Sequence, residues 1–72
     1  MKPPLLSGRQ IVAALRRIGY DVVSQKGSHI TLKHPHKEFP LIVPNHPEVD
    51  RWTLKSILHA GEISVKEFLK AL

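Results

Sequence analysis

Two short turns divide the middle of this chain into three strand-forming runs, and their spacing constrains the fold more than any other feature. The runs are residues 20–25, 29–33 and 39–43, and the turns between them are Gly27-Ser28 and Pro35-His36-Lys37-Glu38. Connections this short join antiparallel neighbours, so the sequence predicts a three-stranded meander. Pro40 cannot donate a ladder hydrogen bond, which predicts that the third strand lies at an edge or begins after this residue.

Helix signals lie on both sides of these strands. Ser7 and Gln10 have the spacing of a capping box, and the apolar residues that follow recur at helical intervals as far as Gly19. This pattern predicts a first helix. Asp50 is the expected N-cap of a second helix that ends near Gly61.

A second capping-box pattern, Ser64-Val65-Lys66-Glu67, predicts a short C-terminal helix in which Val65, Phe68 and Leu69 pack inward. The order helix, meander, helix, short helix is typical of an α+β two-layer sandwich. We expect the two longer helices to cover one sheet face and to leave the other open to solvent. Because a chain of 72 residues buries only about 60% of its unfolded surface, residues 1–72 are predicted to form a single domain.

Basic residues outnumber acidic ones, with eleven Lys and Arg against six Asp and Glu and a formal net charge of +5. This balance favours an anionic partner: nucleic acid first, an acidic protein second, and a membrane surface last, because no helix has a strongly basic amphipathic face. The alternative is that the charge only keeps the domain soluble.

Three absences bear on where the protein is expected to act. No apolar run approaches the roughly 20 residues of a membrane-spanning helix. The segment Met1-Lys2-Pro3-Pro4 is not followed by the apolar stretch of a secretory signal. The chain has no cysteine, which suits a reducing compartment. We therefore expect a soluble, cytoplasmic protein.

His29 is the leading candidate for chemistry, because it opens the second strand directly behind the Gly27-Ser28 turn. If the apolar residues of that strand face the core, the two-residue period of a strand puts His29, Thr31 and Lys33 on the opposite face. A histidine there can take the proton from a ribose 2′-hydroxyl, a step typically worth about 10²–10⁴ in rate that needs no metal. The alternative is an ordinary surface histidine.

Neighbouring residues could assist such a reaction. Lys26 and Lys33 could offset charge that develops on a phosphate, and the Gly27 and Ser28 amides with the Ser28 hydroxyl are possible donors. By contrast, His34, His36 and His46 are a weak metal candidate, because neither a thiolate nor a carboxylate pattern completes the set. We expect no metal and no cofactor, with these histidines solvated in loops.

Arg51 and Lys55 at the start of the second helix could bind RNA phosphates, or they could be surface cations on a capped helix. Between them, Trp52 could stack on a base, but we expect it to pack against the domain. The same two alternatives apply to the basic residues of the first helix, Arg9, Arg16 and Arg17. They could contact phosphates, or they could form a solvated face of the helix.

Several segments occur in a characteristic order after the capped first helix. They are Lys26-Gly27-Ser28-His29, Val43-Pro44-Asn45-His46, Thr53-Leu54-Lys55-Ser56-Ile57-Leu58 and Ala60-Gly61-Glu62-Ile63-Ser64-Val65-Lys66-Glu67-Phe68. Together they resemble the HicA family of bacterial and archaeal toxins over nearly the whole chain. Two departures are Trp52, which stands where a small residue is usual, and the proline-rich loop 45–50, which lacks the usual lysine.

The resemblance implies a fold similar to double-stranded-RNA-binding domains and an mRNA-cleaving activity that halts translation. It also implies a HicB-type antitoxin that occludes the active site, so the protein would be a monomer when free and a hetero-oligomer with its antitoxin. His29 matches the family's catalytic histidine, and Gly27 and Ser28 match the adjoining positions.

The leading hypothesis is thus a metal-independent endoribonuclease toxin, an mRNA interferase of a type II toxin–antitoxin system. The alternatives are an RNA-binding module without catalysis and a protein that docks an acidic partner.

Overall fold

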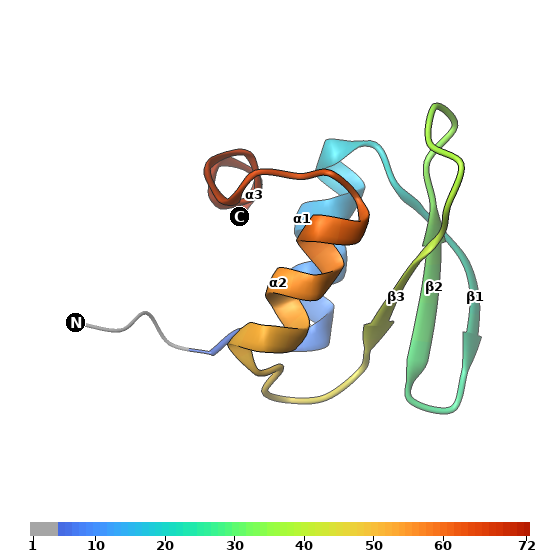
Figure 1. The fold of residues 1–72 in the computed structure, drawn as a ribbon. Helices are drawn as coiled ribbons and strands as arrows, with labels where there is room; N and C mark the ends of the chain where they lie inside the picture. Colours follow the sequence, from blue (N-terminus) through green and yellow to red (C-terminus); the bar gives the residue numbers. More distant parts are fainter. Residues whose placement is uncertain (1–4) are drawn as a thin grey trace.

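The computed structural model describes residues 5–72, and its elements follow the predicted order (Figure 1). They are α1 (Gly8–Ile18), β1 (Asp21–Lys26), β2 (His29–Lys33), β3 (Leu41–Pro44), α2 (Arg51–Ala60) and α3 (Val65–Ala71). The strands form one antiparallel sheet in the order β1-β2-β3. These observations confirm the α+β layout with a short C-terminal helix. The prediction about a secretory signal rests on Met1–Pro4, which lie outside the described residues.

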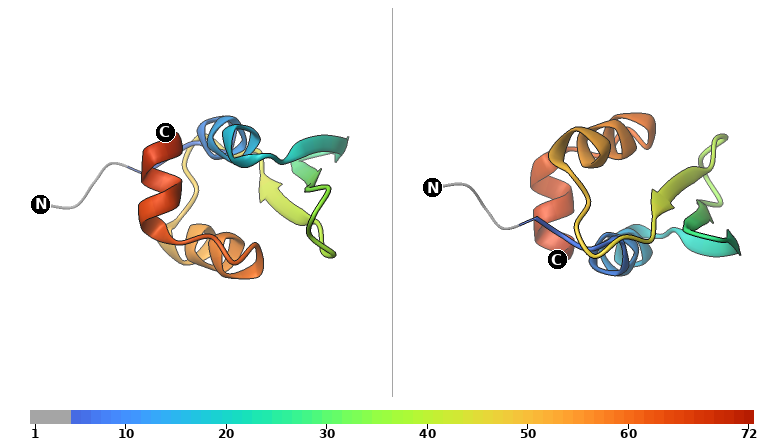
Figure 2. Two further views of the ribbon diagram at one scale, coloured as in Figure 1. Left: turned by 90° about the horizontal axis from the view of Figure 1, so that it is seen from above. Right: turned by 90° about the horizontal axis from the view of Figure 1, so that it is seen from below.

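Helices α1 and α2 lie on the same face of the sheet, and α3 crosses them on the side away from the sheet (Figure 2). A hydrogen bond from Arg17 Nη1 to the Ala71 carbonyl, 2.9 Å long, ties α1 to the end of α3. The core between sheet and helices is aliphatic with two aromatic rings, and its most deeply buried large side chains are Tyr20, Phe68, Ile11, Leu15, Leu32, Leu41 and Val43. In residues 5–72 no helix is long and apolar enough to cross a membrane.

The predicted helix caps are present. Ser7 N–H donates to Gln10 Oε1 at 2.9 Å and Gln10 N–H donates to Ser7 Oγ at 3.1 Å, so the capping box is confirmed. At the start of α2, Thr53 N–H donates to Asp50 Oδ1 at 2.8 Å, and this backbone hydrogen bond lowers the pKa of Asp50. Local signals alone therefore define where these helices begin.

One strand boundary and one packing expectation differ from the prediction. Strand β1 begins at Asp21, because Tyr20 turns into the core as the chain leaves α1. Strand β3 begins after Pro40 and lies at a sheet edge, so the prediction for this strand is confirmed. In α3, Phe68 is buried, but Val65 and Leu69 are 55% and 59% exposed, so the prediction that they pack inward is wrong. The buried side of α3 is defined by Phe68 and, three residues on, the half-buried Ala71, and the other two side chains lie away from it.

Candidate functional site

The two faces of β2 differ as its alternating sequence predicts. Ile30 and Leu32 are buried against the helices, whereas His29 and Lys33 are exposed and Thr31 is half-buried on the other face. We call this other side the open face of the sheet. The expectation that it carries His29, Thr31 and Lys33 is confirmed.

Strand pairing identifies the direct neighbours of His29. Lys26 on β1 and Pro44 on β3 lie opposite His29, and residues directly opposite in an antiparallel pair share a face with Cβ atoms about 4.5–5.5 Å apart. Lys26 is therefore the basic residue directly opposite His29 in the sheet. His29 begins β2 at an end of the sheet, so its imidazole is accessible from the open face and from the hairpin turn.

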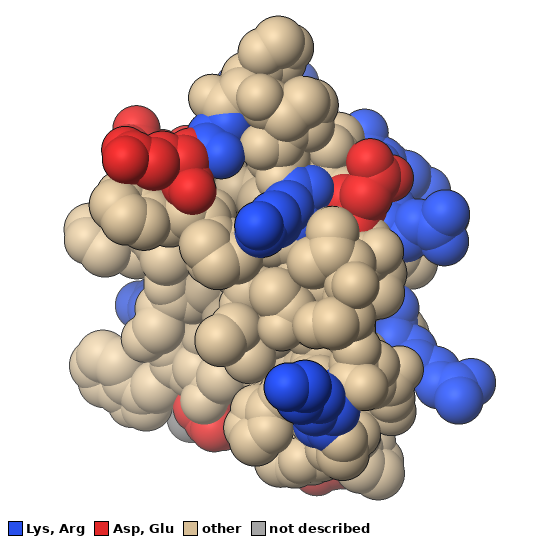
Figure 3. Space-filling model, turned by 90° about the vertical axis from the view of Figure 1, so that its right-hand side faces the viewer, with Lys and Arg blue, Asp and Glu red and all other residues tan. Residues whose placement is uncertain are grey.

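Lys33 has a different environment from Lys26. It lies two residues beyond Thr31 along the strand, and its partner on β1 is Asp21. A phosphate at Lys33 would therefore also lie near the carboxylate of Asp21, which would repel it. Figure 3 views the molecule from the sheet side, where Lys and Arg side chains are spread among uncharged residues and outnumber Asp and Glu. The pairing thus ranks Lys26 above Lys33 as a partner for a phosphate near His29.

The turn between Lys26 and His29 has a defined shape. Gly27 has a φ of 56°, while a Cβ added there would have no atom within 4 Å, so the left-handed backbone and not crowding requires glycine. The Ser28 carbonyl accepts a 2.6 Å hydrogen bond from Asn45 N–H, which ties the turn to the end of β3. Among the turn and loop bonds of residues 5–72, none uses a Gly27 or Ser28 amide as donor. Both amides are available to a ligand.

Ser24 is a polar residue of the open face that sequence reasoning missed. The pairing shifts between Val22 and Ser24, and the irregularity brings Ser24 opposite Thr31. A bulge of this kind depends on the partner strand as well as on the strand that contains it, so no local signal indicated it. The two hydroxyl groups extend the polar surface next to His29.

Arg51 and Lys55 do not join this face. Both are exposed on α2, in the helical layer on the other side of the sheet, so any molecule that touched them and His29 together would have to pass around the sheet edge. Trp52 is 80% exposed, and Lys55 Nζ lies 5.8 Å from the centroid of its ring. The expectation that Trp52 packs against the domain is wrong, since its position on α2 faces solvent.

His46 is exposed and follows Asn45, whose N–H bonds to the Ser28 carbonyl, so it lies near the hairpin turn, whereas His34 and His36 lie beyond the other end of β2. The ring of His34 is half-buried and meets the ring of Tyr20 edge-on, with centroids 5.1 Å apart. Its Nδ1 accepts a 3.0 Å hydrogen bond from His36 N–H. His34 is therefore part of the fold and not a solvated loop residue. Among residues 5–72 no group of three or more His, Asp or Glu side chains is arranged to hold a metal ion.

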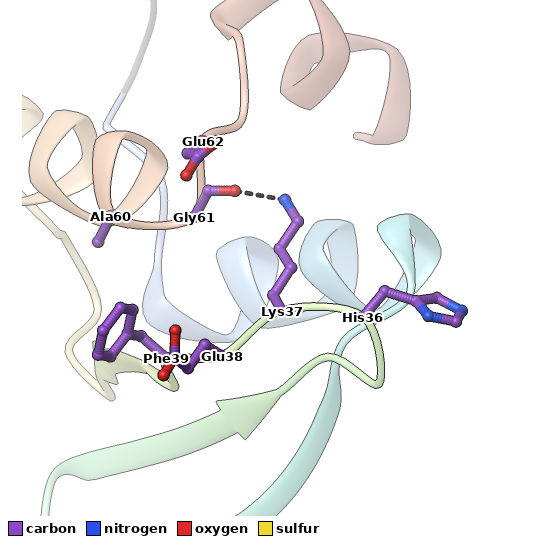
Figure 4. A pocket seen from close by; sticks show the side chains of 7 residues that line it. All are labelled: His36, Lys37, Glu38, Phe39, Ala60, Gly61 and Glu62. Carbon is purple, nitrogen blue, oxygen red and sulfur yellow. Dashed lines mark hydrogen bonds between the residues drawn. The ribbon is translucent and has the colours of Figure 1, made fainter.

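A cavity of about 300 Å³ lies where the β2–β3 turn meets the corner between α2 and α3 (Figure 4). The Lys37 side chain crosses it, donates a hydrogen bond from Nζ to the Gly61 carbonyl, and lies with Nζ 5.7 Å from the Tyr20 ring centroid. Glu38 and Glu62 also line it. Because the lysine is engaged and two carboxylates are present, this cavity does not suit a polyanion.

The described molecule is a small basic α+β domain with an accessible histidine and a neighbouring lysine on an open sheet face. A family model described as HicA toxin of bacterial toxin–antitoxin systems matches residues 8–63 of the 72. The chain therefore belongs to the HicA toxin family, the toxin component of a toxin–antitoxin pair. The match runs from the first residue of α1 to beyond the end of α2 and so includes the whole open face. A search of curated proteins gives no match.

Proposed function

We propose that this protein is a metal-independent endoribonuclease that cleaves mRNA, with His29 as the proton-transfer group. The observation that carries the proposal is the position of His29, exposed at the start of β2 and directly opposite Lys26. Family membership adds weight, because a toxin must act on an essential cellular process and RNA cleavage suits a chain with a net charge of +5.

In the proposed reaction, neutral His29 takes the proton from a ribose 2′-hydroxyl. The 2′-oxygen then forms a bond to the adjacent phosphorus, the bond from phosphorus to the 5′-oxygen breaks, and the leaving oxygen takes a proton from the imidazolium or from water. The products are a 2′,3′-cyclic phosphate and a 5′-hydroxyl end. General-base catalysis of this kind contributes typically about 10²–10⁴ in rate.

Nearby groups would stabilise the charge that builds up on the phosphate. Lys26 is the best placed cation, and Lys33 is the second because Asp21 opposes it. The Gly27 and Ser28 amides could donate to a phosphate oxygen, as preorganised donors do in other active sites. On α2, Arg51 and Lys55 would hold the RNA backbone beyond the sheet edge, and the exposed ring of Trp52 would stack on an unpaired base.

The proposal includes a partner and a location. A HicB-type antitoxin would cover the open face and neutralise the toxin, so the protein would be a monomer when free and a hetero-oligomer when bound. A small acidic antitoxin would complement the basic surface around His29. Cleavage of mRNA requires the protein to act in the cytoplasm.

Cleavage assays with three proteins test the catalytic role. Wild type, His29→Ala and the control His59→Ala, which removes an exposed histidine from α2, are incubated with mRNA in a chelating buffer. We expect His29→Ala to lose at least about 100-fold in rate, while His59→Ala and wild type cleave equally well. Equal rates for wild type and His29→Ala, or wild-type activity that returns only when a divalent metal is restored, would refute the assignment.

The alternative function is an RNA-binding module without catalysis, which the same exposed cations favour. It predicts no cleavage product from wild type, together with RNA affinity that falls with salt at a log–log slope of roughly −0.7 per phosphate contacted on single strands. A measurable product that disappears in His29→Ala would exclude this alternative.

A further inference from the structure

A second cleft lies behind the hairpin that carries His29, on the helical side of the sheet. It holds about 270 Å³ between α1 and β1, which lie next to each other (Figure 2). We call it the α1–β1 cleft. The residues that line it are Arg9, Val12, Val22, Gln25, Ile30 and Asn45.

The lining of the α1–β1 cleft combines three aliphatic and three polar side chains. Of the aliphatic ones, Ile30 is buried and Val22 is 44% exposed. The polar ones are Arg9, Gln25 and Asn45, and none of these side chains makes a hydrogen bond, ion pair or ring contact with another residue in the described part of the chain, 5–72. Carboxamides that present both a donor and an acceptor above an aliphatic surface match the edge and the face of a nucleobase.

The α1–β1 cleft is adjacent to the candidate catalytic residue through the backbone. Gln25 precedes Lys26, the partner of His29, and Ile30 follows His29 on β2. Asn45 donates its backbone N–H to the Ser28 carbonyl at 2.6 Å. The cleft therefore reaches the end of β2 at which His29 lies, but on the opposite face of the sheet, and the hairpin turn connects the two faces at that end.

Size and charge favour a base over other occupants. About 270 Å³ is just below the range of roughly 300–1,000 Å³ of small-molecule sites, so the cleft suits one ring system and not a helix or a folded segment of a protein. None of the six lining residues is acidic, and the exposed Arg9 adds a positive charge that a phosphate linked to the base could contact.

We propose that the α1–β1 cleft binds a nucleobase of the RNA strand near the scissile phosphate, so that Gln25 and Asn45 select the base and set the sequence preference of cleavage. This inference rests on the proposed function, since it requires RNA to reach His29. The RNA strand would cross the Gly27-Ser28 turn, with the phosphate at His29 on the open face and a neighbouring base in the cleft.

Side-chain amide resonances give a direct test, because the chain contains only three carboxamides: Gln10, Gln25 and Asn45. Gln10 is held in the capping box of α1 and serves as an internal control. Wild-type protein would be titrated with four single-stranded RNA homopolymers, of A, C, G or U, that carry 2′-O-methyl riboses and so resist cleavage. We expect the Gln25 and Asn45 NH₂ signals to shift, with one homopolymer binding at least about threefold more tightly than the others, while the Gln10 signals stay in place.

Variants complete the test. Gln25→Ala and Asn45→Ala should reduce the discrimination among homopolymers to less than about twofold and broaden the distribution of bases next to the cleavage sites in a mixed mRNA pool. Ser56→Ala, on the exposed side of α2, should change neither the discrimination nor the cleavage sites.

Unchanged discrimination and unchanged cleavage sites in both cleft variants, with His29-dependent cleavage intact, would overturn this inference alone. No RNA binding by wild type would overturn the proposed function as well, and weakened antitoxin binding without any change in RNA selection would assign the cleft to the protein partner.

Discussion

The two ends of strand β2 carry histidines in contrasting surroundings. His29, its first residue, is exposed next to a lysine on the open face, whereas His34, just beyond its last residue, packs edge-on against Tyr20 and accepts a hydrogen bond from the His36 amide. An imidazole that already has partners is held in one orientation and stabilises the fold. One without them is free to exchange a proton with a ligand. The comparison separates a histidine suited to chemistry from one that the fold requires.

The largest expected effect on stability comes from adding a side chain next to His34. Gly19 ends α1 with a φ of 119°, and a Cβ built there would lie 2.7 Å from His34 Nε2. Gly19→Ala should lower the free energy of unfolding by about 2 kcal/mol or more, through backbone strain and the contact with the ring. In a His34→Ala background the same change should cost less, because only the strain remains. Denaturant unfolding of the four proteins measures this coupling, and strictly additive effects would show that His34 is not packed against the end of α1.

A smaller effect on the free energy of unfolding is expected when each histidine is replaced in turn. His34→Ala loses the ring contact with Tyr20 and the hydrogen bond from the His36 amide, and should lower the free energy of unfolding by about 1 kcal/mol. His29→Ala should change it by less than about 0.5 kcal/mol, because the side chain is exposed. Thermal unfolding of both variants checks the contrast. If His29→Ala were the more destabilising variant, a structural role for His29 would replace the catalytic one.

A comparably small effect at neutral pH is expected from the hydroxyl group of Tyr20, whose ring His34 meets edge-on. Tyr20 Oη is buried and makes no hydrogen bond within the described residues, so Tyr20→Phe should alter stability by no more than about 1 kcal/mol. Burial raises the pKa of the Tyr20 phenol above its ordinary value of 10.0, with smaller contributions from Glu62 and Glu67.

This raised pKa predicts a difference in alkali. The unfolded chain releases the phenol proton first as the pH rises above 10, so wild type should lose stability from that pH upward until the folded pKa is passed. The Tyr20→Phe variant has no phenol proton to release, so its stability should decline less steeply over the same pH range. Unfolding of both proteins at a fixed temperature over this pH range measures the difference. If the stability of the two proteins declined in parallel, the hydroxyl group would be hydrated in the folded state.

Much of the fold could be predicted because its signals are local. The Ser7–Gln10 box, the Asp50 cap and the Gly27-Ser28 turn each act within about four residues, and each occurs where the pattern indicates. The predictions failed where the exposure of a side chain depends on elements that are distant in the sequence. Trp52 and Leu69 are large and apolar, yet their exposure depends on how α2 and α3 are set against the rest of the molecule.

The candidate site divides in the same way. The sequence by itself determined that His29 shares a face of β2 with Thr31 and Lys33, because the two-residue alternation of a strand is a property of its own backbone. Only the tertiary structure decided that Lys26 lies opposite His29 while Asp21 lies opposite Lys33, and that α2 keeps Arg51 and Lys55 away from the open face. Strand register and helix docking depend on packing between residues far apart in the chain, which no short pattern encodes.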